Sequence, residues 1–119
     1  MVKVGIVGLG TMGRQHMDAY LQMPDVEVAG VYDHHPDRAE AFRQQYDVPV
    51  ASSFNALLEC CEIIDICTPT YRHAEYALPA IEAGKAVVCE KPLARTIEDC
   101  ERIAEAVHKH STLFMPAHV

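Results

Sequence analysis

Three glycines follow a short apolar run near the start of the chain with a spacing that suits phosphate binding. Gly8, Gly10 and Gly13 have the Gly-x-Gly-x-x-Gly pattern directly after the β-branched run of residues 2–7. In a strand–turn–helix unit the first glycine permits the tight turn, the second lets the backbone approach a pyrophosphate, and the third lets the helix pack closely on the strand. A helix beginning near Thr11 would offer the phosphates its unpaired N–H groups. The pattern alone is not specific, because such turns also occur without a ligand.

A carboxylate stands where a second strand should end. Residues 26–32 form that candidate strand, and Asp33 follows it 20 residues after Gly13. An acidic side chain at this distance can accept the ribose hydroxyls of an adenosine. The stretch between has apolar residues at helical spacing and ends at Pro24, and His16 on its apolar stripe is predicted to lie in the core. This order of elements, a strand, a glycine turn, a helix, a second strand and a carboxylate, predicts a dinucleotide site.

Length and composition limit the kind of protein. The chain has 119 residues, of which 50% are hydrophobic and 23% charged, as in an ordinary globular protein of one domain. Its formal charge of −7, with scattered basic residues, argues against a nucleic-acid partner, because phosphates require a basic face. No apolar stretch has the length of a membrane span and no signal-peptide pattern opens the chain, so we expect no membrane partner and a cytoplasmic location.

The cysteines and histidines do not form a recognisable disulfide or metal pattern. Five cysteines, an odd number without framework spacing, fit a reducing compartment, and Cys67 is expected to be a small buried side chain. Two close histidine pairs could suggest a metal site, His34 with His35 and His108 with His110. No cysteine or carboxylate completes a four-ligand spacing around them, so we predict no metal site.

After the carboxylate the chain alternates between candidate helices and strands. The expected helices cover about 36–46, 53–58, 72–83 and 96–107, and the expected strands 48–51, 63–67, 86–89 and 112–115. With the first two strands this predicts an α/β fold, a doubly wound parallel sheet (Rossmann fold) of about six strands in the order 3-2-1-4-5-6. The loops at the carboxyl ends of strands 1, 2, 4 and 5 should meet at the ligand crevice.

A Glu-Lys-Pro tripeptide at 90–92 follows the fifth candidate strand. Together with the glycine turn, the strand end at Asp33, the loop 67–70, His73 and the run AGKAVVCEKPLA, it makes the chain resemble the N-terminal half of a Gfo/Idh/MocA oxidoreductase. This is the group of glucose-fructose oxidoreductase and inositol dehydrogenase. The resemblance covers essentially the whole chain, and the tripeptide is specific when it follows the fifth strand of such a domain.

The resemblance implies hydride transfer between a nicotinamide cofactor and a carbinol carbon or carbonyl, usually of a sugar or polyol. Lys91 matches the family lysine that lies near the nicotinamide ribose and the substrate hydroxyl, and is the catalytic candidate. A cation there would stabilise a developing alkoxide. To act as a base, a lysine must have its pKa lowered from about 10.4 by burial or by a neighbouring cation.

The glycine pattern and the resemblance together give a set of cofactor-binding candidates. They are Gly8, Gly10, Thr11, Met12, Gly13, Asp33, His34, Arg38, Thr68, Pro69, Thr70, His73, Glu90, Lys91 and Pro92. For two of them a simpler role stays open, because Arg38 fits an ordinary exposed helix residue and His73 a helix cap. NAD is the expected cofactor and NADP is less favoured, because the Asp33 carboxylate accepts ribose hydroxyls but repels an extra phosphate. His34, His35 and Arg38 could soften that repulsion.

The family pattern is incomplete here, because family enzymes carry a second, C-terminal domain that covers the nicotinamide and binds the substrate. We expect residues 1–119 to be the dinucleotide-binding domain of a longer oxidoreductase, nearly inactive alone. The alternative is a stand-alone nucleotide-binding module, a redox sensor or subunit without catalysis. Without a covering domain, apolar surface around Leu93, Phe114 and Met115 should be exposed, which predicts a homo-oligomer formed through the last strand.

Overall fold

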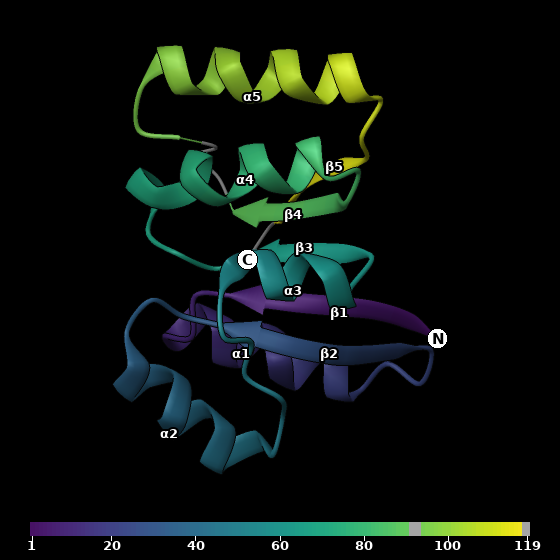
Figure 1. Ribbon diagram of the computed structural model, residues 1–119, viewed down its shortest axis with the longest axis vertical. Coiled ribbons are helices and arrows are strands. Elements are labelled where there is room, and N and C mark those ends of the chain that lie inside the picture. Colours follow the sequence, from purple (N-terminus) through teal and green to yellow (C-terminus); the bar gives the residue numbers. More distant parts are fainter. Residues whose placement is uncertain (91–93, 118–119) are drawn as a thin grey trace.

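A parallel sheet forms the centre of the computed structural model, which describes residues 1–90 and 94–117 (Figure 1). The strands in this part of the chain are β1 (Val2–Val7), β2 (Val26–Tyr32), β3 (Ile63–Ile66), β4 (Ala86–Glu90) and β5 (Phe114–Ala117). They lie in the order β2-β1-β3-β4-β5, and every neighbouring pair is parallel. All carboxyl ends therefore meet at one edge of the sheet. The predicted α/β fold with a doubly wound parallel sheet is confirmed.

The strand predicted at 48–51 is reduced to a single bridge. Val31 and Val50 form an isolated parallel pair, in which the Val31 N–H donates to the Pro49 carbonyl over 3.0 Å and the Ala51 N–H donates to the Val31 carbonyl over 2.8 Å. Pro49 has no N–H with which to extend this ladder. The segment still lies beside β2, where the predicted order 3-2-1-4-5-6 places it, so the error concerns the number of full strands and not their arrangement.

Helices cover both faces of the sheet (Figure 1). They are α1 (Thr11–Leu21), α2 (Pro36–Tyr46), α3 (Phe54–Cys60), α4 (His73–Glu82) and α5 (Ile97–His110), with a 3-10 turn η1 (Thr70–Arg72) before α4. Met17 of α1 and Phe42 of α2 belong to the core of one face. Leu57 of α3, Ile81 of α4 and Ile103 of α5 belong to the core of the other. The two faces are therefore separate apolar clusters on either side of the strands.

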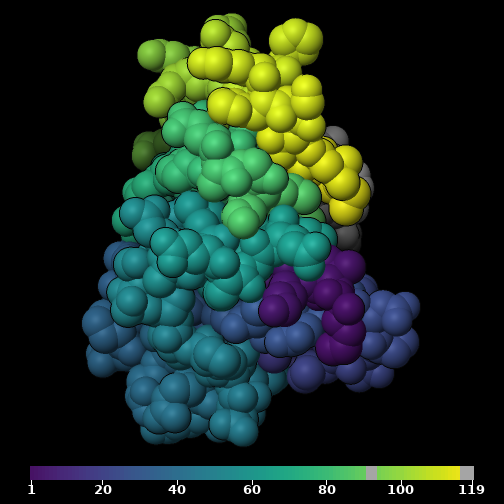
Figure 2. All heavy atoms as spheres, turned by 45° about the vertical axis from the view of Figure 1, so that its right-hand side comes forward, coloured from purple at the N-terminus to yellow at the C-terminus, as the bar shows by residue number. Residues whose placement is uncertain are grey.

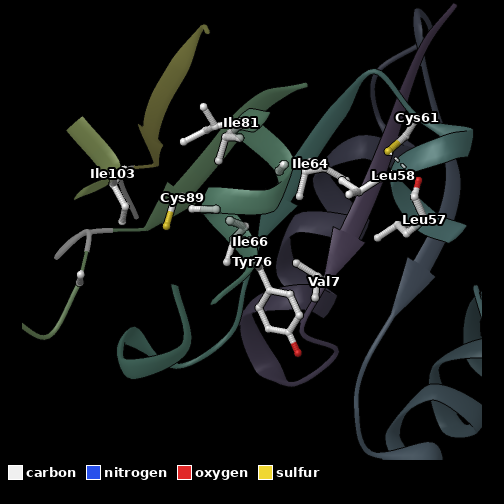
Figure 3. Packing of buried hydrophobic residues seen from close by; sticks show 14 residues of the cluster. Val7, Leu57, Leu58, Cys61, Ile64, Ile66, Tyr76, Ile81, Cys89 and Ile103 are labelled. Atoms are coloured by element: carbon white, nitrogen blue, oxygen red, sulfur yellow. Dashed lines mark hydrogen bonds between the residues drawn. The ribbon is translucent and has the colours of Figure 1, made fainter. Parts of the chain in front are cut away.

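Strand β3 shows how the pleat divides side chains between these faces. Ile64 and Ile66 enter the cluster that also holds Leu57 and Tyr76 (Figure 3). Asp65 lies between them and therefore faces the opposite side, toward α1, with none of its surface exposed. A carboxylate buried so deeply requires hydrogen-bond or charge partners, and these are His16 and Tyr20 of α1.

Two helices begin within one residue of the starts expected at 53 and 96, each after a capping side chain. The Ser53 hydroxyl accepts a hydrogen bond from the Ala56 N–H at the start of α3, over 3.0 Å. The Thr96 hydroxyl accepts one from the Asp99 N–H at the start of α5, over 3.1 Å. Such caps fix where each helix begins, because they satisfy an N–H group that has no partner within the helix.

The last strand forms an edge of the sheet. Residues toward the C-terminal end, yellow in Figure 2, lie along the surface of the molecule. Leu113 is 63% exposed and Met115 50% exposed, whereas Phe114 is half-buried and Leu93 lies outside the described residues. The expected apolar exposure is therefore present at the described part of this edge. Among the helices described, none combines the length and apolar character that crossing a bilayer requires.

Candidate active site at the carboxyl edge of the sheet

A cleft of about 280 Å³ opens at the carboxyl edge, above the ends of β1, β2 and β3. Its lining comes from the three loops that follow these strands and from the starts of the helices. The residues are Val7, Gly8, Leu9, Gly10, Thr11, Met12, Asp33, His34, Arg38, Cys67, Thr68, Pro69, Arg72 and Tyr76. The first two glycines of the turn and the carboxylate singled out from the sequence therefore line one cavity, whereas Gly13 is not part of the lining.

The glycine turn is packed tightly on its inner side and open on its outer side. Gly8 has φ +95°, and a Cβ there would lie 2.6 Å from the carbonyl carbon of Cys67. A Cβ on Gly13 would lie 2.2 Å from the Gly8 carbonyl oxygen, whereas one on Gly10 would meet nothing within 4 Å. Gly10 is also the N-cap of α1 and has no side chain with which to cap the helix. The helix N-terminus thus faces open space in which an anion can approach its N–H groups.

Asp33 is held as an anion at the wall of the cleft. It is 8% exposed, and its two carboxylate oxygens accept hydrogen bonds from the Leu9 N–H over 2.9 Å and the His35 N–H over 2.8 Å. Burial opposes its ionisation, but the hydrogen bonds from Leu9 and His35 and the charge of the His35 ring outweigh burial and lower the pKa of Asp33. A carboxylate so fixed can accept hydroxyl groups and repels phosphate.

The loop after β3 supplies the facing wall. Thr68 and Pro69 line the cleft, and the buried Thr68 hydroxyl has no hydrogen-bond partner among the described residues. Thr70 begins the turn η1 and is not part of the lining. His73 lies beneath the loop, 1% exposed, and its Nε2 donates to the Thr68 carbonyl over 3.0 Å. His73 therefore fixes the shape of this wall and does not itself line the cleft.

The tripeptide at 90–92 is described only at its first residue. Glu90 ends β4 and does not line the cleft. One of its carboxylate oxygens lies 3.3 Å from Nε2 of His16, and its side chain is 17% exposed. Lys91, the predicted catalytic residue, and Pro92 lie outside the described residues.

Some residues of the site were not indicated by the sequence. Arg72 and Tyr76 line the cleft, and the Arg72 guanidinium reaches the His34 ring, with Nη1 2.7 Å from Nδ1. In the sequence, nothing marks these two residues as part of a binding site except that they follow the end of a strand. The prediction that His16 is a plain core residue is wrong, because its side chain is 18% exposed and its Nδ1 lies 2.6 Å from Oδ2 of Asp65. Asp65, the one acidic residue in an otherwise apolar candidate strand, was the available signal.

Two groups of side chains in the described part of the chain have the types that bind metal ions. They are His16 with Asp65 and Cys67, and Asp33 with His34 and His35, and within each group the donor atoms lie within 4.8 Å of one another. In both groups the carboxylate already accepts hydrogen bonds from the protein. Burial also raises the pKa of the Cys67 thiol, which opposes the thiolate form that a metal requires. We therefore assign no metal to either group.

The cleft fits a nicotinamide dinucleotide. The open space at Gly10 suits a pyrophosphate and the Asp33 carboxylate suits a ribose. The Thr68 hydroxyl, which no described residue pairs, leaves a polar group for a ligand to satisfy. These are features of the protein alone, and they meet at the switch point of the sheet where ligands of doubly wound folds bind.

Comparisons with known proteins agree with this geometry. Residues 2–118 match the family GFO_IDH_MocA, described as an oxidoreductase family with an NAD-binding Rossmann fold. Inositol 2-dehydrogenase from Klebsiella pneumoniae is 37% identical over 120 residues, covering 91% of this chain and 34% of the relative. Glucose-6-phosphate 3-dehydrogenase from Bacillus subtilis is 31% identical over 111 residues, covering 93% of this chain and 32% of the relative.

Solved structures show the same likeness. An NAD-binding protein from Listeria innocua superposes with a TM-score of 0.87 and is 36% identical, covering 97% of this chain and 34% of that protein. A UDP-N-acetylglucosamine 3-dehydrogenase from Acidithiobacillus ferrooxidans gives a TM-score of 0.89 with 26% identity, covering 97% of this chain and 38% of that protein. The chain thus spans about a third of the length of the relatives it matches. With its glycine turn and buried carboxylate in one cleft, the chain belongs to the Gfo/Idh/MocA oxidoreductase family and has its NAD-binding Rossmann fold.

Proposed function

We propose that this chain is the cofactor-binding part of an oxidoreductase that transfers a hydride between NAD and a hydroxyl carbon or carbonyl of a sugar-like or polyol-like substrate. The observation that carries the proposal is the placement of Asp33, an anion held by two backbone N–H groups, in the same cleft as the glycine turn. Two relatives are named as dehydrogenases of inositol and of glucose 6-phosphate, which supports this class of substrate.

Different residues of the cleft would bind different parts of the cofactor. The N-terminus of α1, from Gly10 onward, is the site for the pyrophosphate, because its N–H groups are open to the cleft. Asp33 is the site for the adenosine ribose. His34 and Arg38 line the cleft next to it and can contact the adenine, and Thr68 is the polar group on the facing wall.

The chemistry divides between cofactor and protein. When bound, NAD supplies the hydride acceptor and, once reduced, the hydride donor. Lys91 is the residue proposed to orient the substrate hydroxyl and to handle its proton. It lies outside the described residues, so this role rests on the family resemblance and on the Glu-Lys-Pro sequence at the end of β4. A negative charge at Asp33 also favours NAD over NADP, since the 2′-phosphate of NADP would lie beside it.

We also propose that the groups that select the substrate lie outside these 119 residues, because the chain spans about a third of its relatives. The partner of the whole protein is then a small sugar-like or polyol-like molecule and not a nucleic acid. The composition favours a cytoplasmic location for it. In the alternative, a stand-alone sensor or subunit, the same cleft would bind the dinucleotide without any hydride transfer.

Calorimetric titration of the chain with NADH and with NADPH tests the proposal. We expect NADH to bind at least about tenfold more tightly than NADPH, a difference of about 1.4 kcal/mol. In Asp33→Asn, NADH affinity should fall about 10- to 100-fold, because a hydrogen bond to a charged group contributes about 1.5–3 kcal/mol. The affinity for NADPH should fall less, because the substitution also removes the repulsion between the Asp33 carboxylate and the 2′-phosphate.

Asp37→Asn is the matched control. Asp37 is an exposed acid in the first turn of α2, four residues along the chain and outside the cleft lining, so its loss removes the same charge without the ribose acceptor. Its NADH affinity should stay within about twofold of the parent chain. Equal affinities for NADH and NADPH in the parent chain, or equal effects of the two substitutions, would contradict the role of Asp33.

A further inference from the structure

A second polar cluster lies outside the cleft, on the α1 face of the sheet. It consists of His16 and Tyr20 of α1, Asp65 of β3 and Glu90 of β4, and is called the His16 cluster below. Asp65 Oδ2 accepts a hydrogen bond from the Tyr20 hydroxyl over 2.6 Å and lies 2.6 Å from Nδ1 of His16. On the other side of the ring, Nε2 of His16 lies 3.3 Å from Oε1 of Glu90. One imidazole thus joins the ends of two neighbouring strands to the helix that follows the glycine turn.

The two carboxyl groups of the His16 cluster favour the protonated form of the ring. Asp65 is fully buried, and its Oδ2 meets both the Tyr20 hydroxyl, which donates to it, and the His16 ring. The hydrogen bond from His16 to Asp65 raises the pKa of His16 against the opposing effect of burial, and Glu90 raises it further. The His16 ring of α1 thus lies between the carboxyl groups of Asp65 in β3 and Glu90 in β4. Buried charges persist when they are paired in this way.

Glu90 depends on this ring more than Asp65 does. Its Oε1 is buried and has no hydrogen-bond partner among the described residues, and Nε2 of the His16 ring lies 3.3 Å from it. Asp65 keeps the Tyr20 hydroxyl if the ring is removed. Loss of His16 would therefore leave Asp65 partly satisfied but would free the Glu90 carboxylate.

The cluster does not form a nucleophilic cysteine site. Cys67 Sγ lies 3.4 Å from Nδ1 of His16, the same nitrogen that faces Asp65, whereas a base oriented by a carboxylate must meet the thiol with its other nitrogen. Burial also raises the pKa of the Cys67 thiol. Among the described residues, the titratable groups recorded against His16 are Asp65 and Cys67, from β3 and its end, and Glu90 from β4. Tyr20, on the same helix as His16, meets the same oxygen of Asp65.

Glu90 lies at the end of the sheet over which the nicotinamide half of a dinucleotide would extend. A dinucleotide crosses the carboxyl edge of a doubly wound sheet with its two halves on opposite sides of the switch point. Asp33, after β2, marks the adenosine side, so the nicotinamide half extends over the ends of β3 and β4. Glu90 is the last residue of β4 and lies on that side. We propose that His16 is a positioning residue, which holds the Glu90 carboxylate in place for the nicotinamide half of the cofactor; this rests on the proposed function.

The first test needs no cofactor. Proton–nitrogen NMR of the histidine rings in the chain should show a His16 titration midpoint above that of an ordinary histidine, about 6.5. In Glu90→Gln the midpoint should fall, because one of the two carboxylates beside the ring is removed. An unchanged midpoint would show that the ring and Glu90 are not coupled, and would overturn the proposal.

The second test separates the two halves of the cofactor. Calorimetry should compare ADP, which carries only the adenosine and pyrophosphate, with NADH. In His16→Gln we expect ADP affinity within about twofold of the parent chain and NADH affinity lowered about tenfold, the equivalent of one hydrogen bond. Equal losses for ADP and NADH, or no loss for either, would overturn the positioning role.

Tyr20→Phe is the matched control for a merely structural effect. It removes the other donor to Asp65 from the same helix and leaves the contact between His16 and Glu90 in place. It should lower the stability of the chain and leave the ratio of NADH to ADP affinity unchanged; a ratio that falls as it does in His16→Gln would overturn the proposal. If the parent chain binds neither ligand, the proposed function fails and the cofactor-facing role fails with it, whatever the NMR titration shows of the pair.

Discussion

The glycines of the turn between β1 and α1 differ in what an added methyl group would meet, so alanine substitutions should separate folding from binding. At Gly13 a Cβ would lie 2.2 Å from the Gly8 carbonyl oxygen, a contact that only a backbone shift relieves. At Gly10 a Cβ would meet nothing within 4 Å, and its φ of −88° lies outside the left-handed region that favours glycine. Gly13→Ala should therefore destabilise the chain, and Gly10→Ala should instead weaken cofactor binding.

The expected sizes follow from these contacts. Overpacking against backbone costs up to about 3 kcal/mol, and the better helix propensity of alanine offsets about 1 kcal/mol of it. Gly13→Ala should thus lose about 2 kcal/mol, or about 8 °C in Tm at roughly 4 °C per kcal/mol. For Gly10→Ala the poorer N-cap costs about 0.5–1 kcal/mol, and the reduced freedom of the unfolded chain offsets a similar amount. Its Tm should change by less than about 2 °C.

Thermal unfolding followed by circular dichroism measures the first quantity and calorimetric titration with NADH the second. Gly10→Ala should bind NADH at least about tenfold more weakly, because its methyl group occupies the space next to the helix N-terminus. Gly84→Ala is the control, since Gly84 has φ +78° with nothing within 4 Å of its Cβ position and lies outside the cleft lining. It should lose about 1 kcal/mol through strain and keep its NADH affinity. This reasoning would be refuted if Gly10→Ala bound NADH normally, or if Gly10→Ala lowered the Tm as much as Gly13→Ala does.

Tyr20→Phe removes a hydrogen bond to the buried Asp65 carboxylate and should lower the free energy of unfolding in urea by about 1.5–3 kcal/mol. The Tyr46 hydroxyl makes its hydrogen bond at the exposed surface, so Tyr46→Phe should lower the free energy of unfolding by less than about 1 kcal/mol. Equal losses would contradict the burial argument. Because the pKa of Asp33 is lowered on folding, its carboxylate contributes stability above its unfolded pKa of about 3.9 and loses it as the pH falls through the lower folded value. The stability difference between the parent chain and Asp33→Asn should therefore shrink below about pH 4 in urea titrations, and a difference constant from pH 7 down to acid unfolding would count against it. Met115→Lys at the exposed edge should reduce concentration-dependent association in sedimentation, and a parent chain that stays monomeric at high concentration would disprove the predicted homo-oligomer.

The unit from β1 to Asp33 could be predicted because each of its signals is local. A β-branched run, glycines at fixed spacing and an amphipathic stretch each define their own segment, and the connection between parallel strands has one favoured hand. The same reasoning gave the order of the strands, and it failed only at 48–51, where Pro49 limits the pairing with β2 to one bridge. Residues 91–93, which include the predicted catalytic Lys91, lie outside the described structure, so that part of the site stays a prediction.

The partners of individual polar side chains could not be predicted, because they depend on contacts between distant segments. Helical spacing placed His16 on an apolar stripe, but the α1 face of β3 carries Asp65, which turns that position into a charged contact. Arg72 enters the cleft only because the loop after β3 folds back toward the end of β2 and brings it to His34. The sequence by itself determined the fold and the class of ligand, since both follow from short-range patterns of residue type. Only the tertiary structure decided which charges meet, because side chains 38 and 49 residues apart become neighbours only when the sheet assembles.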